Sequence, residues 1–311
     1  MARVAVVLGS GGARGYAHLG AVEELRARGH EIVALSGTSM GALVGGLVAA
    51  GSETDFAAWA LSLTHGRVLR LVDPTAAGGG AVALHRLMRT LEDLVGDVVI
   101  EDLPISYTAV ATDLAARREV WFQRGPLIPA IRASIAIPGV FTPAVVAGRV
   151  RVDGGLLNPL PLDPTAAAAA DFTFAVSLQG PRVPHEPVSP ARGLSARSPD
   201  WAVDLRRRFG RSGPGGAERS EQPPAVQPTD TGAAGSLGPG VSSELRTSEV
   251  LAQSFDAMQG LITRYRLAAL PPDVLVTVPL SAARTLDFHR AAELIALGRT
   301  LAAEALDDAG R

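Results

Sequence analysis

The feature that most constrains this chain is a sharp turn from an apolar strand into an apolar helix. Residues 32–35 (Ile-Val-Ala-Leu) are typical of a buried strand, and residues 42–50 are typical of a buried helix. Between them lies the pattern Gly37-x-Ser39-x-Gly41. In such a turn the residues two before and two after the serine crowd each other, and glycine at both positions removes the colliding β-carbons. The pattern predicts a nucleophile elbow, with Ser39 strained at the start of a helix, where N–H groups favour negative charge.

A Gly-rich loop precedes this turn in the chain. It follows a short apolar strand at residues 4–8 and leads into an amphipathic helix at about 16–28. Strand, Gly-rich loop and helix make an anion-binding arrangement, because successive N–H groups without bulky side chains can turn toward one negative centre. The loop residues that we assign to this anion site are Gly11, Gly12, Ala13, Arg14 and Gly15.

Two anions fit such a loop: the pyrophosphate of a dinucleotide or a transient oxyanion. A dinucleotide site requires the spacing G-x-G-x-x-G and an acidic residue at the end of the second strand. This chain has Gly9-x-Gly11-x-x-x-Gly15 instead, and Leu35-Ser36 where the acidic residue would stand. We therefore expect an oxyanion site and no cofactor.

A third signal is an aspartate at the end of a predicted hairpin. Residues 145–152 alternate around a glycine, and the second arm leads to Asp153, Gly154 and Gly155. An aspartate before two glycines is most often only a turn. However, the glycines leave the carboxylate uncovered and let other backbone approach closely. Asp153 is therefore a candidate partner for Ser39.

The rest of the chain predicts the fold class. Strand-like and helix-like segments alternate, which favours an α/β fold with a mainly parallel central sheet and helices on both faces. The composition changes between about 180 and 243, where ten of the 22 prolines fall. We predict one domain spanning residues 1–311 with a flexible Pro-, Gly- and Arg-rich insertion at about 180–243. A helix at 201–209 inside it would stack three apolar side chains beside an Arg cluster, either packing on the domain or touching a membrane surface.

Composition excludes several classes of protein. A formal net charge of −2 gives no general attraction to nucleic acid. The chain has no cysteine, so disulfides and cysteine-bound metals are excluded. No group of His, Asp and Glu residues shows ligand spacing, so we expect no metal.

The first apolar run ends after five residues, and no run approaches the ~20 residues of a membrane span. We expect a cytoplasmic protein, with transient peripheral contact with membranes left open.

Taken together, the motifs resemble the patatin-like phospholipase family in its short bacterial form. The matching stretches are residues 9–20, 37–43, 133–143 (Ala-Ser-Ile-Ala-Ile-Pro-Gly-Val-Phe-Thr-Pro) and 152–161, and residues 255–298 are also similar. The resemblance implies the family's three-layer fold. It also implies a serine acyl hydrolase that works with a Ser–Asp dyad, without histidine and without metal.

Carried over to this chain, the resemblance makes Ser39 the nucleophile and Asp153 the base, with the Gly-rich loop as the oxyanion hole. Arg14 stands where the family has Arg or Lys, and it either adds positive charge or anchors the loop. Ser10 departs from the family's pattern, because plant members have a glycine there.

The predicted reaction is hydrolysis of acyl esters of lipids through an acyl-enzyme, as in a phospholipase A, a lysophospholipase or an esterase. Two alternatives stay open. One is a Ser-His-Asp esterase with His289 or His18 as base, since Ser39, Asp153 and His289 follow the chain order of an α/β-hydrolase. The other is a weakly active lipid-binding or regulatory protein on the same fold. The sequence names neither the lipid class nor the oligomeric state.

Overall fold

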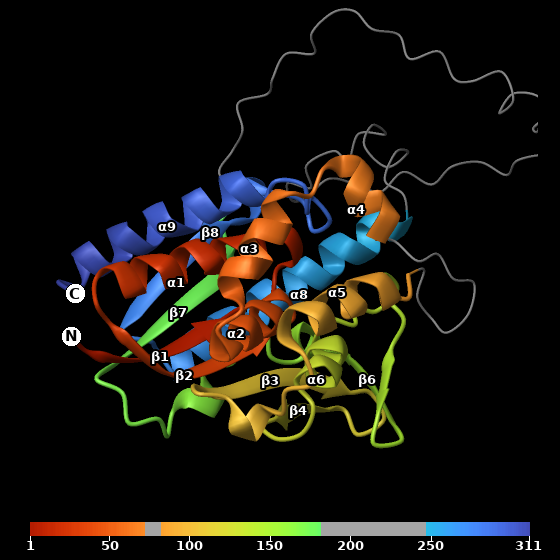
Figure 1. Cartoon of the computed structure of the whole chain (residues 1–311), viewed down its shortest axis with the longest axis horizontal. Coiled ribbons are helices and arrows are strands. Elements are labelled where there is room, and N and C mark those ends of the chain that lie inside the picture. Colours follow the sequence, from red (N-terminus) through yellow and green to blue (C-terminus); the bar gives the residue numbers. More distant parts are fainter. Residues whose placement is uncertain (72–81, 182–246) are drawn as a thin grey trace, which may run out of the picture. The chain divides into compact units, whose positions relative to one another are not determined.

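An eight-stranded sheet forms the centre of the described part of the chain (Figure 1). The computed structural model describes residues 1–71, 82–181 and 247–311. From the sequence we also predict a Pro- and Gly-interrupted loop at residues 73–80, and it lies outside the described residues. So does the insertion at about 180–243 with its candidate helix at 201–209, apart from Gly180 and Pro181.

The strands include the apolar runs predicted at residues 4–8 and 32–35 and the predicted hairpin at 145–152. Their order is β5-β6-β3-β2-β1-β7-β8, and β4 also pairs with β3. The five strands from β3 to β8 along this order are parallel, whereas β4 and β6 run antiparallel to β3, and β5 forms a hairpin with β6. The prediction of a mainly parallel sheet is confirmed. The bounds are β1 Arg3–Leu8, β2 Glu31–Thr38, β3 Ser106–Asp113, β4 Arg118–Phe122, β5 Ala144–Val146, β6 Arg149–Asp153, β7 Phe172–Gly180 and β8 Val274–Pro279.

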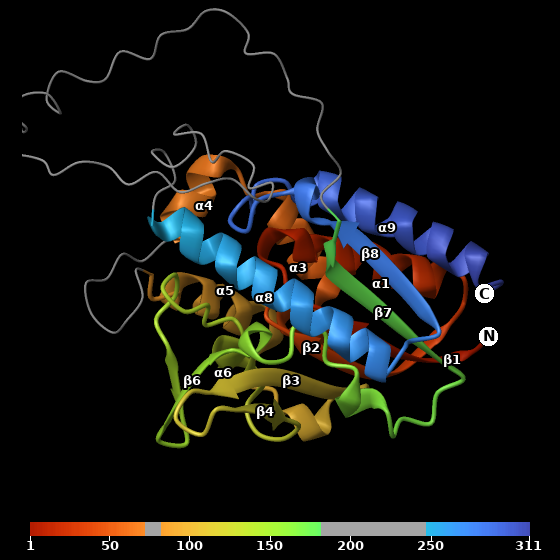
Figure 2. The same cartoon turned by 180° about the vertical axis from the view of Figure 1, so that it is seen from behind.

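Helices cover both faces of the sheet, as predicted. In the sheet, β2 lies on one side of β1 and β3 lies beyond β2, so the chain moves in one direction from β1 to β3. From β7 to β8 the chain moves in the opposite direction across the sheet. Because such crossovers are right-handed, their helices fall on opposite faces. Figure 1 shows α1, α2, α3 and α9 on one face, and Figure 2 shows α8 across the other. The bounds are α1 Ala17–Ala27, α2 Met40–Ala50, α3 Glu53–Leu61, α4 His65–Leu71, α5 His85–Val95, α6 Leu127–Ser134, α8 Thr247–Ala269 and α9 Ala291–Asp308.

Pairing along β3 brings two strand ends together. β4 pairs with β3 over residues 109–113, while β2 and β6 pair with it over 106–110 and 111–113. Overlapping stretches cannot share one edge of a strand, so β2 and β6 lie end to end along the edge opposite β4. Thr38, the last residue of β2, therefore lies beside Asp153, the last residue of β6.

No helix within the described ranges combines the length and the apolar character needed to cross a membrane.

Candidate active site

Ser39 joins β2 to α2 in the strained conformation expected of the elbow. Its φ of 57° and ψ of −124° lie in a region that residues with side chains rarely adopt. Such a conformation typically costs ~1–3 kcal/mol. Ser39 is also 2% exposed. The packed surroundings therefore hold the nucleophile candidate in place.

The two elbow glycines permit close contacts between backbone segments. A Cβ at Gly37 would lie 2.2 Å from the carbonyl oxygen of Gly41, which is the crowding across the turn that the sequence predicts. A Cβ at Gly41 would lie 2.0 Å from the carbonyl oxygen of Leu8. Glycine is thus required at 41 for a different reason from the one expected, because α2 begins directly against the end of β1.

Asp153 ends β6 and is completely buried. Its backbone N–H donates to the carbonyl of Ala136 at 2.9 Å, and its Oδ1 accepts from the N–H of Gly155 at 2.7 Å. Burial raises the pKa of this carboxyl to about 7, against the smaller lowering effects of the Ser39 hydroxyl and the Gly155 N–H. A carboxyl with this pKa can accept and return a proton near neutral pH.

The side chains of Ser39 and Asp153 are apposed. The hydroxyl is close enough to lower the pKa of the carboxyl. However, Oδ2 of Asp153 accepts no hydrogen bond of ordinary geometry from any described residue. The contact is therefore looser than a formed hydrogen bond, as is common before a substrate binds. One carboxylate oxygen stays open to receive a proton.

The hairpin that carries Asp153 is fixed to β3 by ion pairs. Asp113, which ends β3 and is 1% exposed, pairs with Arg149 at 2.6 Å and with Arg151. The Arg149 guanidinium, the N–H of Ala116 and the charge of Arg151 hold the pKa of Asp113 well below its usual range. Since Arg149 and Arg151 belong to β6, these pairs help to place the strand that ends in the candidate base.

The Gly-rich loop presents two N–H groups that are not used elsewhere. The N–H groups of Gly9, Ser10 and Ala13 donate to backbone carbonyls at 2.8–3.0 Å. Within the described part of the chain, the N–H groups of Gly11 and Gly12 donate to no other group. Of the residues assigned to the oxyanion hole from the sequence, Gly11 and Gly12 are therefore the available backbone donors, whereas Ala13 is already engaged.

Arg14 joins the loop to the C-terminal part of the chain. Arg14 and Gly15 belong to the short 3₁₀ turn that leads into α1. The Arg14 side chain is 3% exposed. Its Nη1 lies 3.4 and 3.3 Å from the carbonyl oxygens of Leu280 and Ala283, and its Nη2 lies 3.8 Å from the carboxylate of Asp256. These contacts support the anchoring role rather than direct contact with an oxyanion.

His18 contacts the start of the Gly-rich loop. It lies on α1 and is completely buried, and its Nε2 is 2.8 Å from the carbonyl oxygen of Gly9. Burial lowers the pKa of His18 to about 4, so the ring is neutral at pH 7 and donates its Nε2–H to that carbonyl. The residue therefore packs against the loop as a neutral hydrogen-bond donor.

His289 lies on the surface, in the segment before α9. Its ring packs edge to face on that of His65, with 5.3 Å between the ring centroids. No histidine in the described ranges makes a hydrogen bond to Ser39 or Asp153. The arrangement thus differs from the one that a Ser-His-Asp triad requires.

Ser134 contacts the elbow directly, and the sequence assigned it no role. It lies at the end of α6, in the stretch 133–143, and is completely buried. Its Oγ accepts the backbone N–H of Ser39 at 2.9 Å and donates to the carbonyl of Val110 at 2.6 Å. A lone serine in a helical pattern carries no signal for such a contact.

Gln259 is the second residue that the sequence did not single out. It lies on α8 and is 2% exposed. Its Nε2 donates to Oγ of Ser10 at 3.2 Å, and a Cβ at Gly155 would come within 2.3 Å of the same nitrogen. Glutamine on an amphipathic helix usually faces solvent, so only the packing of α8 shows this contact.

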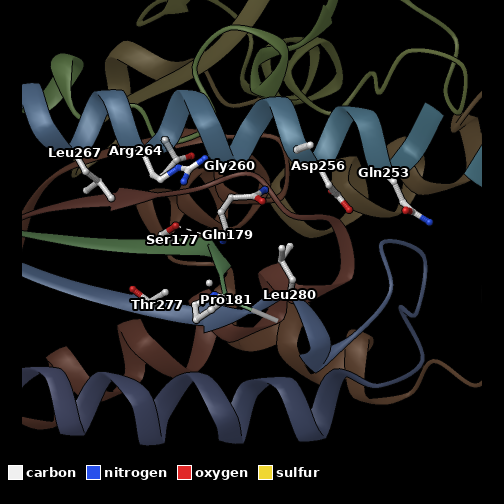
Figure 3. A pocket seen from close by; sticks show the side chains of 13 residues that line it. Ser177, Gln179, Pro181, Gln253, Asp256, Gly260, Arg264, Leu267, Thr277 and Leu280 are labelled. Atoms are coloured by element: carbon white, nitrogen blue, oxygen red, sulfur yellow. Dashed lines mark hydrogen bonds between the residues drawn. The ribbon is translucent and has the colours of Figure 1, made fainter. Parts of the chain in front are cut away.

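A cavity of about 680 Å³ lies between α8 and the strands β7 and β8 (Figure 3). Gln179 on its wall donates through Nε2 to Oε1 of Gln259 at 2.7 Å, so the wall is connected to the Gly-rich loop. Neither Ser39 nor Asp153 lines this cavity. It is a neighbour of the candidate active site rather than part of it.

The fold places the Ser39 hydroxyl next to the buried carboxyl of Asp153, and it packs the Gly-rich loop, with the unused N–H groups of Gly11 and Gly12, against the start of α2. Among the described residues no three His, Asp or Glu side chains gather as ligands would around a metal ion. The arrangement has the parts for nucleophilic attack, proton transfer and stabilisation of an oxyanion.

Comparison with known proteins relates this chain to one family. The sequence model of a family described as patatin-like phospholipase matches residues 6–166. A protein of Mycobacterium tuberculosis named as an uncharacterised member of the NTE family is 46% identical over 344 residues, covering 98% of this chain and 91% of that protein.

Two further relatives match shorter stretches. A patatin-like phospholipase domain-containing protein of Caenorhabditis elegans is 34% identical over 51% of this chain and 12% of its own length. The lysophospholipase NTE1 of Mycosarcoma maydis is 33% identical over 56% of this chain and 10% of its own length. The family model spans half of the chain and includes Ser39, Asp153 and the Gly-rich loop. With a 46% identical relative aligned over nearly the whole sequence, this chain belongs to the patatin-like phospholipase family.

Proposed function

We propose that this chain is a serine acyl hydrolase that cleaves acyl esters of lipids through an acyl-enzyme. The observation that carries the proposal is the apposition of a strained, buried Ser39 and a completely buried Asp153 whose pKa is about 7. Membership of the family supports a lipid ester as the substrate, and one relative is named a lysophospholipase.

In the acylation step, Oγ of Ser39 attacks the ester carbonyl carbon while Asp153 takes the hydroxyl proton. The carbonyl oxygen becomes an oxyanion, and we assign its stabilisation to the N–H groups of Gly11 and Gly12, which donate to no other described group. Each such donor is typically worth ~10²–10³ in kcat. Collapse of the intermediate breaks the bond to the alcohol, and Asp153 returns the proton to that alcohol as it leaves.

In the deacylation step, water attacks the acyl-enzyme and gives its proton to Asp153. The second tetrahedral intermediate collapses to release the fatty acid, and the proton returns to Oγ of Ser39. One ester and one water thus become one acid and one alcohol. A carboxyl with a pKa near 7 suits both directions of transfer, because it gains and loses the proton with little energetic bias at neutral pH.

We also propose that the end of the sheet beside Ser39, where the parallel strands finish, touches the lipid surface transiently. The parallel strands end there, and Figure 1 shows α4 and the β5–β6 hairpin at the same end. Exposed apolar side chains on segments beside the site are Val145 (71%) and Val150 (45%) on the hairpin that carries Asp153, and Leu286 (52%), which follows Thr285 next to Gly12. Exposed apolar groups around a site are typical of a surface that meets lipid or another protein.

A fluorophosphonate probe tests the nucleophile. We expect the wild-type protein to be labelled at Ser39, as identified by peptide mass, and to hydrolyse a p-nitrophenyl ester and a lysophospholipid. Ser39→Ala should lose labelling and about 10³ or more of the rate, because the members of a catalytic unit act together. Its melting temperature should stay close to wild type, because alanine keeps the Cβ, and with it the backbone strain, of Ser39.

Ser36→Ala is the matched control, since Ser36 is a completely buried serine on β2, the strand that leads to Ser39, and it donates to the carbonyl of Pro161. It should keep both labelling and turnover. Labelling of Ser39→Ala at the wild-type rate, or hydrolysis that survives in it, would remove Ser39 as the nucleophile.

A further inference from the structure

The end of α6 contacts the backbone of both candidate catalytic residues. Oγ of Ser134 accepts the N–H of Ser39 at 2.9 Å. Two residues later, the carbonyl of Ala136 accepts the N–H of Asp153 at 2.9 Å. Residues 134–136 therefore form a short bridge between the backbone of the nucleophile and that of the base.

The same serine is tied to β3. Its hydroxyl donates to the carbonyl of Val110 at 2.6 Å, so its proton is used there and its lone pair faces the N–H of Ser39. Val110 pairs with Thr38, and the next residue, Ala111, pairs with Asp153. The hydroxyl of Ser134 thus links the elbow to the point on β3 where the two catalytic strands meet.

We propose, on the basis of the function proposed above, that Ser134 is a positioning residue that sets the distance between the hydroxyl of Ser39 and the carboxylate of Asp153. The N–H of Ser39 donates to the side chain of Ser134 instead of to a neighbouring strand. Ser134 gives that N–H an acceptor in a place where no water-facing alternative exists, because both serines are 2% exposed or less. Without it the elbow is free to relax toward an ordinary backbone conformation, which moves the hydroxyl away from the base.

The test compares Ser134→Ala with Ser36→Ala. Both changes remove a completely buried hydroxyl that donates to a backbone carbonyl at 2.6 Å, but only Ser134 also accepts the N–H of Ser39. We expect Ser134→Ala to lower kcat for a soluble ester by about ten- to a hundredfold with little change in KM. Ser36→Ala should keep kcat within about twofold of wild type.

The pH profile separates positioning from a merely structural role. The Ser39 hydroxyl lowers the pKa of Asp153, so loss of that contact should move the acidic limb of kcat/KM to higher pH in Ser134→Ala. A variant that is only less stable should show the wild-type limb. Equal kcat and equal pH profiles in the two alanine variants would overturn the proposal.

Ser134→Cys keeps the experiment decisive if the alanine variant does not fold. A thiol fills the space but accepts a hydrogen bond weakly, so kcat should again fall while the melting temperature stays near wild type. Because the chain has no cysteine, thiol titration before and after unfolding shows whether the new side chain is buried. Failure of both variants to fold would make Ser134 a residue of the fold and reject the positioning role.

The outcomes for the two proposals are distinguishable. Inactive wild-type protein that the probe does not label would refute the proposed function, and the role of Ser134 in it would fall as well. Active wild-type protein with a fully active Ser134→Ala variant would refute only the positioning role.

Discussion

Ser39 and Asp153 are each held in a state that costs stability. Ser39 has a φ of 57°, and Asp153 has no exposed surface. A strained backbone and a buried carboxyl are both unfavourable on their own, so other contacts of the fold must maintain them. Residues that cost stability in this way are expected in an active site, because activity there can require a conformation or a burial that lowers stability.

The buried carboxyl of Asp153 leads to a signed prediction about stability. Because its pKa rises from 3.8 to about 7 on folding, the folded protein keeps a proton in this range that the unfolded chain has released. Asp153 therefore makes the free energy of unfolding decrease between about pH 4 and about pH 7. We expect Asp153→Asn to be more stable than wild type by on the order of 2–4 kcal/mol at pH 8 and close to it at pH 4.

Urea denaturation at the two pH values measures this difference. Ser36→Ala is a suitable reference, because it changes no titrating group. If Asp153→Asn and wild type had the same stability difference at pH 4 and pH 8, the carboxyl would not be buried in the way described.

The site residues differ in how far the sequence alone could predict them. Gly37 and Ser39 carry a local pattern, because the crowding at Gly37 comes from Gly41 within the same five-residue turn, whereas the crowding at Gly41 comes from Leu8 at the end of β1. Ser134 and Gln259 carry no such pattern, because Ser134 contacts Ser39, 95 residues away, and Gln259 contacts Ser10, 249 residues away. Polar residues in helical patterns usually face solvent, so their burial depends on packing that no local pattern contains.

At the scale of elements, the helices α1 and α9 cross at two glycines. A Cβ at Gly20 would lie 1.9 Å from the carbonyl oxygen of Ile295, and one at Gly298 would lie 2.0 Å from that of Ala17. Glycine normally weakens a helix relative to alanine. Here it lets the two backbones approach, and α1 is the helix that follows the Gly-rich loop.

Alanine at two helical glycines should therefore have opposite effects. Gly298→Ala should lower the melting temperature by several degrees, because the new methyl group collides with backbone that cannot move easily. Gly260→Ala on α8, where a Cβ would meet nothing within 4 Å, should instead stabilise the protein by about 0.5–1 kcal/mol. Differential scanning calorimetry of both variants checks the pair. Stabilisation by Gly298→Ala would mean that the crossing is wider than described.

Sequence patterns predicted the kinds of element but not their arrangement. Alternating strands and helices indicate a parallel sheet, and that prediction is confirmed. The meeting of β2 and β6 along one edge of β3 was not predictable, because it depends on two separate pairings with β3: Thr38 pairs with Val110, 72 positions away, and Ala111 pairs with Asp153, 42 positions away. The partners of Asp113 on the hairpin lie 36 and 38 positions away, and charge alone does not identify them.

At the scale of the whole molecule, we propose a single domain, and all the motifs that resemble the family lie outside the insertion at about 180–243. Ser39 and the Gly-rich loop, together with Asp153, come from the chain before residue 182. After residue 246, α8 covers the other face of the sheet. The exposed valines of the β5–β6 hairpin, Val145 and Val150, form an apolar rim on the hairpin that carries Asp153.

The rim predicts a difference between soluble and aggregated substrates. Val145 and Val150 pair across the hairpin and are 71% and 45% exposed, so changing both to serine should not affect folding. The double variant should hydrolyse a soluble p-nitrophenyl ester at the wild-type rate within about twofold and should bind phospholipid vesicles several-fold more weakly, because less apolar area is buried at the surface. The matched control is Leu275→Ser on β8, which is 36% exposed and lies away from the hairpin. Vesicle binding that is equal in wild type and the double variant would argue against a lipid contact at this edge.

The central claim is that Asp153 is the base and that no histidine shares this role. The most direct measurement is the rate of ester hydrolysis by folded Asp153→Asn, His289→Gln and His18→Gln proteins, each compared with Ser39→Ala. An amide has nearly the shape of the carboxyl but cannot accept the proton, so Asp153→Asn should lose activity almost as completely as Ser39→Ala. His289→Gln should keep the wild-type rate within about twofold, since this ring is exposed and packs on His65.

His18→Gln should lose only the part of the rate that depends on the position of the Gly-rich loop, because His18 holds the carbonyl of Gly9. These variants are to be read singly, since the effects of residues in one catalytic unit do not add. We expect Asp153→Asn to be inactive and both glutamine variants to hydrolyse the ester. A folded histidine variant as inactive as Ser39→Ala would contradict the dyad and establish a triad.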